Sequence, residues 1–541
     1  MLDLQRLTTT LWRGLLIALS CLALRLLAIW IYRLTFHPLA KYPGPWLAKV
    51  SDLYGAYHNA RGQLHIETEK GHRRWGPLIR QGPDKLVFNS ATALHDVYSS
   101  NEVQKSYGYT TMIPAPGAYN IFTAVDKGIH KHKRKVLSQG FSDQCVRAFE
   151  PKILDHIDIF LAKLVGSPER GSGDGEWSTP ANMTDRCRHL GYDIMGEFGF
   201  GQSFELQLKD DNRFLIEAVT ATTNKAGVYV QYPALANLKL EKLLYQRGLG
   251  MREKYLQLMS DLVRSRISKE KDAKNDLLYF LADAKDPETG LGFTEDEIWA
   301  ESRFLLIAGA DTTSTALTTA FFYLSAYPAC YEKLAYEIRN TFSSGSEIRS
   351  GPKLAQCQYL RACIDESLRM SPPISGTLWR EVCAGGHVID NEYVPAGYDV
   401  GVNPYAVHHN EDCFPDSFTF KPERWIPSAD NSEKDIERAR RAFSVYSIGS
   451  RACAGRNMAY TELGDSIART MWYSDFRRPE GPLGVVGAGA EGSREGRHRV
   501  KEFQLMEHLT CSHDGPFLQF CGRKGLTDEL FHDRRAPPAS Y

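Results

Sequence analysis

The chain of 541 residues is long enough for two or three average domains, or for one unusually large one. Lysine plus arginine and aspartate plus glutamate are equal at 65 each, so no net field favours nucleic acid or a strongly acidic partner. Its 11 cysteines are spread singly without a CxxC pair, which argues against a zinc site and a disulfide framework and favours a reducing compartment.

An apolar segment lies close to the start of the chain. Residues 11–32 are interrupted only by Arg13, Ser20 and Arg25. As a helix, roughly 22 residues at about 1.5 Å each would cover the ~30 Å core of a bilayer. No small-residue cleavage site follows, so we interpret residues 1–33 as a membrane anchor rather than a secretory signal peptide. The basic residues that come next place the rest of the chain on the cytoplasmic side.

The segment after the anchor, residues 34–50, contains YPGP at 42–45 and predicts a stiff hinge, because its prolines and glycine prevent a helix from continuing. Residues 78–89 predict two short strands around a Gly-Pro turn. Beyond them the pattern is mainly helical, and we expect loops at 166–178 and 284–290. The expected helices lie near 126–140, 148–165, 181–198, 251–271 and 294–327. No linker divides residues 50–470, so we expect one large domain over 51–480.

The longest expected helix, 294–327, carries unexpected polar residues. Thr294 and Glu297 predict a capping box at its start, and its middle is apolar almost all round, as in a helix that crosses a large core. Gly309, Asp311 and Thr312 lie in this apolar stretch. Either the helix is a kinked core helix whose threonines bond back to the preceding turn, or these residues belong to a site.

A second unusual stretch is 446-YSIGSRACAGRN-457. The small residues on both sides of Cys453 leave space for a flat, wide group to approach the sulfur, and the nearby arginine suggests that this group carries carboxylates.

Taken together, these stretches resemble a cytochrome P450, a haem-thiolate monooxygenase. The cysteine segment is similar to the family's F-x-x-G-x-R-x-C-x-G, and 308-AGADTT-313 is similar to A/G-G-x-D/E-T-T/S. Between them lie 366-ESLR-369, which matches E-x-x-R, and 422-PERW-425. The resemblance covers roughly residues 30–475. It implies a mainly α cytochrome P450 fold with small β-sheets, preceded by a single N-terminal transmembrane helix.

The resemblance also implies a cofactor, haem b, and the residues that hold it. Cys453 would be the axial thiolate, which pushes electron density onto the iron. The other cofactor-binding residues implied by the family are His130, Arg134, Arg380, Gly449, Arg451 and Gly455. The alternative for this stretch, a solvated basic face that meets an acidic partner, could hold for Lys131, Lys133 and Lys135 at the same time.

Two further groups are assigned by the resemblance. Glu366, Arg369 and Arg424 are expected to form a buried charge network that braces the cysteine loop, since the first two share a helix face. Asp311 and Thr312 are the expected catalytic pair, delivering protons during oxygen activation in a groove opened by Gly309.

Residues 481–541 depart from the family and form an atypical C-terminal tail. Residues 487–499 are nearly structureless in composition. They include a G-x-G-x-x-G at 487–492, which lacks the following helix and the sheet of a Rossmann unit. Residues 516–520 are a candidate terminal strand. The tail therefore puts in doubt the substrate loop that the family has there.

The function implied by the resemblance is insertion of one oxygen atom from O₂ into a small lipophilic metabolite (terpenoid, polyketide or aromatic) in secondary-metabolite biosynthesis. The residue patterns of 192–204 and 419–425 are similar to those of fungal members of the family. Because the chain has no credible flavin or nicotinamide domain, the implied partner is an NADPH-cytochrome P450 reductase. The expected location is the endoplasmic reticulum membrane, with the catalytic domain cytosolic.

Two alternatives remain open from the sequence. One is an O₂-independent haem-thiolate isomerase or dehydratase, against which the Asp311–Thr312 pair argues. The other is a catalytically inactive membrane protein, if the altered C-terminus prevents haem retention.

Overall fold

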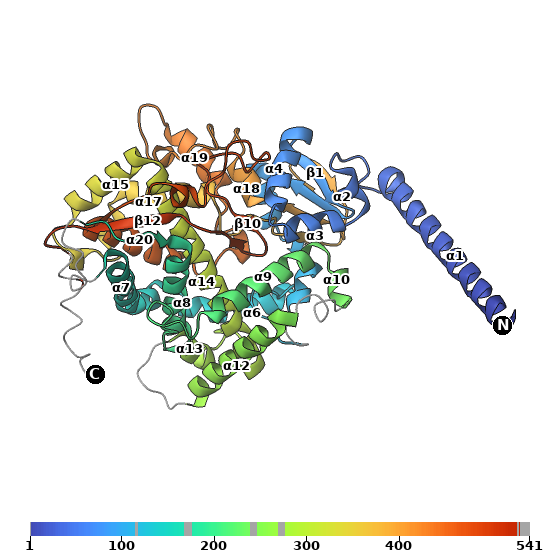
Figure 1. Ribbon diagram of the computed structural model, residues 1–541, viewed down its shortest axis with the longest axis horizontal. Helices are drawn as coiled ribbons and strands as arrows, with labels where there is room; N and C mark the ends of the chain where they lie inside the picture. Colours follow the sequence, from blue (N-terminus) through green and yellow to red (C-terminus); the bar gives the residue numbers. More distant parts are fainter. Residues whose placement is uncertain are drawn as a thin grey trace.

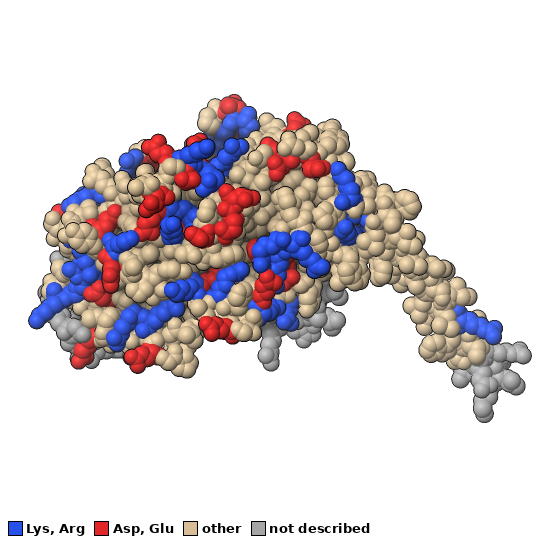
Figure 2. All heavy atoms as spheres, turned by 90° about the horizontal axis from the view of Figure 1, so that it is seen from above, with Lys and Arg blue, Asp and Glu red and all other residues tan. Residues whose placement is uncertain are grey.

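The N-terminal apolar segment forms one helix, α1 (Leu2–Ile31), which passes into a π-helical turn over Tyr32–Phe36 and projects away from the body of the molecule (Figure 1). The span Leu7–Phe36 reaches a mean hydropathy of 2.3 in a window of which 0% is buried against the protein. Basic and acidic side chains alternate over the face of the body seen in Figure 2, whereas α1 is almost free of them. The helix is thus long and apolar enough to cross a membrane, as the sequence predicts.

The computed structural model describes residues 2–113, 117–166, 176–238, 246–268, 276–526 and 530. The helices of the body are α2 (Trp46–Val50), α3 (Leu53–Ala60), α4 (Leu64–Trp75), α5 (Ala91–Tyr98), α6 (Lys127–Gly140), α7 (Asp143–Val165), α8 (Met183–Phe200), α9 (Phe214–Gln231), α10 (Ala234–Asn237), α12 (Gln246–Ser268), α13 (Leu277–Asp283), α14 (Glu295–Ala326), α15 (Pro328–Thr341), α16 (Pro352–Ala355), α17 (Gln358–Met370), α18 (Pro404–His408), α19 (Glu433–Ala442) and α20 (Arg456–Tyr473). The strands are β1 (Leu78–Gly82), β2 (Lys85–Phe88), β3 (Val103–Lys105), β4 (Ala181–Asn182), β5 (Arg380–Val382), β6 (His387–Ile389), β7 (Glu392–Val394), β8 (Asp399–Val402), β9 (Ser474–Arg477), β10 (Met506–Glu507), β11 (Cys511–Ser512) and β12 (Phe517–Gly522). The expected class, mainly α with small β-sheets, is confirmed.

The main sheet lies near the C-terminal end of α1, where the chain enters the body (Figure 1). Its order is β1-β2-β8-β5-β3, with β2 and β8 parallel and the other neighbours antiparallel. The predicted hairpin at 78–89 is therefore present as β1 and β2. In the pairing of β3 with β5, Lys105 lies opposite Arg380, and this register matters for the site below.

The hinge is packed onto this sheet rather than extended in solvent. A Cβ on Gly44 would lie 2.4 Å from the carbonyl oxygen of Arg80, so only glycine allows the approach to β1. The Arg80 side chain, 0% exposed, donates to the carbonyls of Pro83 and Arg33, each at 2.7 Å. One buried guanidinium thus fixes the hinge to the body.

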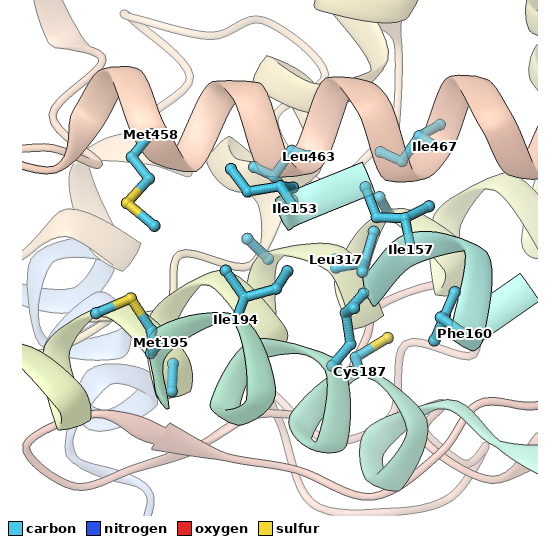
Figure 3. Close-up of a cluster of buried hydrophobic side chains, with 14 of the residues drawn as sticks. Ile153, Ile157, Phe160, Cys187, Ile194, Met195, Leu317, Met458, Leu463 and Ile467 are labelled. Carbon is cyan, nitrogen blue, oxygen red and sulfur yellow. The ribbon is translucent and has the colours of Figure 1, made fainter. Parts of the chain in front are cut away.

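The core of the body is built around α14, which packs on α8 and α20. Figure 3 shows apolar side chains from four helices meeting there. They are Ile153, Ile157 and Phe160 of α7, Cys187, Ile194 and Met195 of α8, Leu317 of α14, and Met458, Leu463 and Ile467 of α20. The predicted capping box of α14 is present: the backbone N–H of Glu297 donates to Thr294 Oγ1 (3.3 Å), and Glu297 Oε2 accepts from the N–H of Thr294 (3.0 Å).

The other expected helices are present with some different bounds. Helix α7 begins earlier than predicted because Ser142 caps it, and it continues through Pro151. Helix α12 also begins earlier, and the predicted stretch 269–271 lies outside the described residues, as does most of the expected loop at 166–178. The expected loop at 284–290 is confirmed.

The tail folds into the body as far as it is described. Strand β12 lies between β4 and β9, which confirms the predicted terminal strand, and β10 and β11 form a hairpin. The loops at 487–499 are held by Arg497, which donates to the carbonyls of Leu505 (2.7 Å) and Gly62 (3.0 Å). The described part of the tail is therefore packed into the body.

Deleting residues 1–31 is expected to release the protein from membranes while leaving the body folded, because the Arg33 carbonyl that binds Arg80 is retained. A deletion through Arg33 removes that acceptor and is expected to lower the free energy of unfolding by about 1–3 kcal/mol relative to the shorter one. Sedimentation with membranes tests the first statement, and denaturant unfolding followed by circular dichroism tests the second. Equal unfolding midpoints for the two deletions would contradict the role of Arg80.

Candidate functional site

The cysteine loop, residues 446–457, presents an accessible sulfur. The N–H of Cys453 donates to the carbonyl of Tyr446 (2.8 Å), which closes the loop ahead of α20. Burial raises the pKa of the Cys453 thiol, against the N–H of Gly455 and the Arg134 guanidinium, which lower it. The side chain is nevertheless exposed. The sulfur is therefore accessible from outside the loop.

The two glycines of the cysteine loop, Gly449 and Gly455, have different surroundings. Gly449 has a φ of +73°, and a Cβ on it would lie 2.1 Å from the carbonyl oxygen of Tyr98 at the end of α5. Its backbone contact with α5 therefore requires glycine. A Cβ on Gly455 would meet only Phe141, at 3.8 Å, so this side of the sulfur is open. Their roles in cofactor binding stay predictions.

Two of the predicted arginines attach the helix α6 region to the cysteine loop. Arg134 of α6 donates to the carbonyl of Ala452 (2.6 Å). Arg451 donates to the carbonyls of Ala124 and Val125, at 2.7 and 2.9 Å, just before α6 begins. Arg134 thus binds the residue that precedes Cys453, and Arg451 itself lies two residues before Cys453 in the sequence.

Arg380, on β5, has a cationic neighbour that the sequence did not reveal. Lys105 lies directly opposite it on β3, and both are buried. The Lys105 ammonium sits 3.4 Å from the centre of the Phe122 ring. Like charges opposite each other destabilise a sheet unless something compensates them, so this pair points to an anion that both would bind.

Lys105, Arg134, Arg380 and Arg451 form a cation cluster, and the His130 ring lies among them. In the described part of the chain, its lysine and arginines contact backbone carbonyls and rings, and none forms a salt bridge with a carboxylate. Burial, together with Arg380 and Arg451, lowers the pKa of Lys105 well below its usual value. Burial and Arg380 likewise lower the pKa of Arg451 to about 10, and burial with the neighbouring cations lowers that of His130 to about 3.

The donor set fits haem. Buried cations that repel one another are stabilised when carboxylates join them, and haem carries two propionates on one edge of a flat macrocycle. The accessible Cys453 sulfur beside this cluster provides the axial ligand type that such a group takes in haem-thiolate proteins.

The face of α14 that points into the same region carries Phe304, Ala308 and Thr312, spaced by four residues and all partly uncovered. Phe304 stacks on Phe122, with ring centres 5.3 Å apart, and Phe122 lies against Lys105. This contact brings the α14 face next to the cation cluster.

The predicted catalytic pair lies on different sides of α14. Thr312 donates to the carbonyl of Ala308 (2.6 Å), so the back-bonding expected of a core helix is present. Asp311 is buried and accepts a hydrogen bond from Thr510 of the tail. Burial raises the pKa of Asp311, while Arg188 of α8 and Thr510 oppose the rise.

The prediction of a groove at Gly309 is wrong. A Cβ on Gly309 would lie 2.5 Å from the sulfur of Met195, so the missing side chain makes room for α8. The interpretation of the lysine-rich stretch of α6 as a solvated basic face is also wrong for Lys133. Lys133 is 0% exposed and pairs with Glu297 (2.8 Å) and Glu301 (3.4 Å) of α14, because it lies three residues after His130 on the inner face of α6.

The predicted charge network is present and buried. Glu366 and Arg369 of α17 form a two-armed ion pair, with N–O distances of 2.8 and 2.9 Å. Arg424 lies 3.4 Å from the same carboxylate, and the indole N–H of Trp425 donates to it at 3.0 Å. Burial works to raise the pKa of Glu366, but the two arginines hold it below its ordinary value. Breaking such a buried pair costs about 3–5 kcal/mol.

The tail supplies functional contacts that sequence reasoning missed. Thr510 binds Asp311 across 199 residues of chain. His513 reaches Thr315 of α14 (3.1 Å) and Thr184 of α8 (2.7 Å). No local signal in the tail's sequence indicates these partners, since they depend on how the β10–β11 hairpin meets α14.

Comparison with known proteins agrees with this geometry. Residues 53–473 match the cytochrome P450 family, and the chain belongs to that family. It is 38% identical over 500 residues to the cytochrome P450 monooxygenase AKT7 of Alternaria alternata, covering 91% of this chain and 94% of that protein. It is 35% identical over 513 residues to the cytochrome P450 monooxygenase apf7 of Gibberella fujikuroi (91% and 95%), and 36% identical over 520 residues to the cytochrome P450 monooxygenase poxM of Penicillium oxalicum (96% of each).

These matches establish the class of protein. The chain is an oxidoreductase, a cytochrome P450 monooxygenase with haem as its cofactor and a cysteine thiolate as the family's iron ligand. A match over 91–96% of the chain must also extend past residue 480. Part of the tail therefore aligns with these relatives, although its composition is unusual for the family.

Replacing Lys105 with alanine is expected to speed haem loss about tenfold, because one charge-assisted hydrogen bond of about 1.5 kcal/mol is removed. Transfer of haem to excess apomyoglobin measures the rate. Lys131→Ala is the matched control, since Lys131 is exposed on the outer face of α6. Equal rates in the two variants would show that Lys105 does not hold the cofactor.

Proposed function

We propose that the protein inserts one atom of O₂ into a small lipophilic metabolite, a terpenoid, polyketide or aromatic compound, in secondary-metabolite biosynthesis. The observation that carries this is the accessible Cys453 sulfur beside the cation cluster and the partly uncovered face of α14. The similarity to fungal monooxygenases supports the fungal metabolic setting.

In this proposal Cys453 is the axial ligand of haem b. The cation cluster holds the propionates, and Gly449 and Gly455 shape the loop around the sulfur. Glu366, Arg369 and Arg424 brace the segment that leads to the loop. When bound, the haem supplies activation of O₂ at its iron, and the thiolate favours O–O cleavage.

Asp311 and Thr312 handle protons. Burial raises the pKa of Asp311, and Thr510 fixes the orientation of its carboxyl. Thr312 donates its hydrogen to the Ala308 carbonyl, which leaves the hydroxyl lone pairs free to accept a hydrogen bond on the uncovered face of α14. In the proposal, Asp311 relays protons from the tail side of α14, and Thr312 holds the group that delivers them on the uncovered face.

The electrons come from a second protein in this proposal. The family match occupies residues 53–473, and what remains is the anchor (1–33), the hinge (34–50) and the short tail (481–541). We assign the electron supply to an NADPH-cytochrome P450 reductase on the same membrane, which we take to be the endoplasmic reticulum, with the catalytic domain (51–480) on the cytosolic side. The apolar α1 supports this arrangement.

Cys453→Ser is expected to abolish the red-shifted Soret band of the ferrous-carbonyl thiolate complex, because serine is a much poorer ligand for this iron. The spectrum of purified protein measures it. Cys145→Ser, a half-buried cysteine on α7, is the control and should keep the band. A band unchanged in Cys453→Ser would remove Cys453 from the site.

Thr312→Ala is expected to uncouple turnover, so that NADPH and O₂ are consumed with little oxygenated product. Asp311→Asn should slow turnover by about 10²-fold or more, with a larger solvent isotope effect. The measurement is NADPH use against incorporation of labelled O₂ into a lipophilic metabolite extract. Thr319→Ala, further along α14 and bonded back to Thr315, is the control. Wild-type coupling in both site variants would make the pair structural and favour O₂-independent chemistry.

A further inference from the structure

A small cavity of about 20 Å³ lies between the end of α9, the segment that precedes β5 and the β10–β11 hairpin. Its walls are mostly apolar. The lining includes Val230, Ile374, Leu378 and Leu509, and its polar members include Gln231, Thr377, Glu507 and His508. A space of this size accommodates one polar group the size of a water molecule, not a whole metabolite. It therefore suits a single functional group on a larger ligand.

Glu507 is the unusual member of this lining. Its side chain is 1% exposed, and a Cβ on Gly376 would lie 2.4 Å from its Oε1, so glycine at 376 makes room for the carboxyl. Asn59 reaches Oε1 only at 3.4 Å. Oε2 has no hydrogen-bond partner among the described residues, although the His65 ring lies 3.4 Å away.

The atoms around this carboxyl share its lack of partners. Asn59 Oδ1, His65 Nδ1 and His508 Nδ1 are buried and unpaired within the described chain. Together with Glu507 Oε2 they form a cluster of buried polar atoms. The nitrogen and amide oxygen atoms can accept a hydrogen, and the Glu507 carboxyl can donate one when it is protonated. A buried polar atom without a partner costs free energy, so the cluster suits a ligand group that can both donate and accept.

The cavity adjoins the reaction site on two sides. Leu378 in its wall lies two residues before Arg380 of the cation cluster, and its carbonyl accepts from Arg380 (3.4 Å). Leu509 in its wall precedes Thr510, which binds Asp311. A metabolite lying along the uncovered face of α14 can therefore extend one end into the cavity.

The charges nearby decide between kinds of donor. Burial raises the pKa of Glu507 to about 8, so the carboxyl is protonated and neutral near pH 7. The charged neighbours are of both signs: Arg497 acts on the adjacent His65, and Arg380 and Asp399 both act on Tyr109 in the cavity wall. An ammonium would find no counter-charge on the neutral Glu507 carboxyl, whereas a hydroxyl donates and accepts without carrying charge.

We propose that Glu507, with Asn59 and His508, binds a hydroxyl group of the substrate, so that the enzyme acts on a lipophilic alcohol rather than on a hydrocarbon. This rests on the monooxygenase function proposed above and names the class of its substrate. A site built to bind a hydroxyl rejects analogues that lack one, because its own polar atoms are then left unpaired. The substrate thus carries oxygen before it arrives, which requires an earlier hydroxylation or reduction step.

The test compares lauryl alcohol with its methyl ether, which keeps the chain and the oxygen but loses the donor. Each is titrated into the holoenzyme, and binding is followed by the change in the haem Soret spectrum. The wild type is expected to bind the alcohol about tenfold more tightly than the ether. Glu507→Leu should bind the two equally.

Three further variants control this comparison. Glu502→Gln alters another buried glutamate of the tail, bound to Tyr405 and Arg499 outside the cavity, and should keep the preference. Glu507→Gln retains an acceptor and should also keep most of it. Gly376→Ala, whose methyl group displaces the carboxyl, should lose it and replaces Glu507→Leu if that variant fails to load haem.

The outcomes separate this inference from the function beneath it. Equal affinities in the wild type, or an undiminished preference in both Glu507→Leu and Gly376→Ala, would overturn the hydroxyl site alone. A wild-type protein without the ferrous-carbonyl thiolate band would overturn the monooxygenase proposal, and the substrate class with it.

Discussion

Mutual repulsion among buried cations beside Cys453 is the constraint on which the arrangement of this protein depends. Lys105, Arg134, Arg380 and Arg451 come from the main sheet, helix α6 and the cysteine loop, and none of them forms a salt bridge within the described chain. Backbone carbonyls and aromatic rings hold their cationic groups in place. In the proposed arrangement the haem propionates would relieve this repulsion, and cofactor binding would then add to the stability of the body.

The charge network of α17 has the opposite character. Glu366 is surrounded by two arginines, an indole N–H and a backbone N–H, so its carboxylate is satisfied without any ligand. The partners of Glu366 all come from the chain itself, so this network requires no ligand to balance its charge. The proposed haem site differs, because the repulsion among its cations is not balanced by a salt bridge within the described chain.

Sequence reasoning succeeded where short spacing determines geometry. Glu366 and Arg369 are three apart on one helix, and the Thr294 capping box likewise depends on local spacing alone. It failed where distant segments meet. Lys105 faces Arg380 only through the register of β3 with β5, and Met195 fills the space beside Gly309 only because α8 crosses α14 there. Lys133 was predictable in principle, since it shares the inner face of α6 with His130 and Arg134.

The order of these parts along the chain has a consequence for how the enzyme is made. Every residue of the cation cluster, and Cys453 itself, leaves the ribosome before the tail does. Yet the tail supplies Thr510 to the buried acid, and β12 closes the core with Leu518 and Phe520, each 0% exposed. A chain that ended before Thr510 would therefore keep Cys453 and the cation cluster but lose the hydrogen bond to Asp311. It would also lose the strand that buries Leu518 and Phe520 in the core, so the last part of the chain to be made is needed to complete the first part of the core.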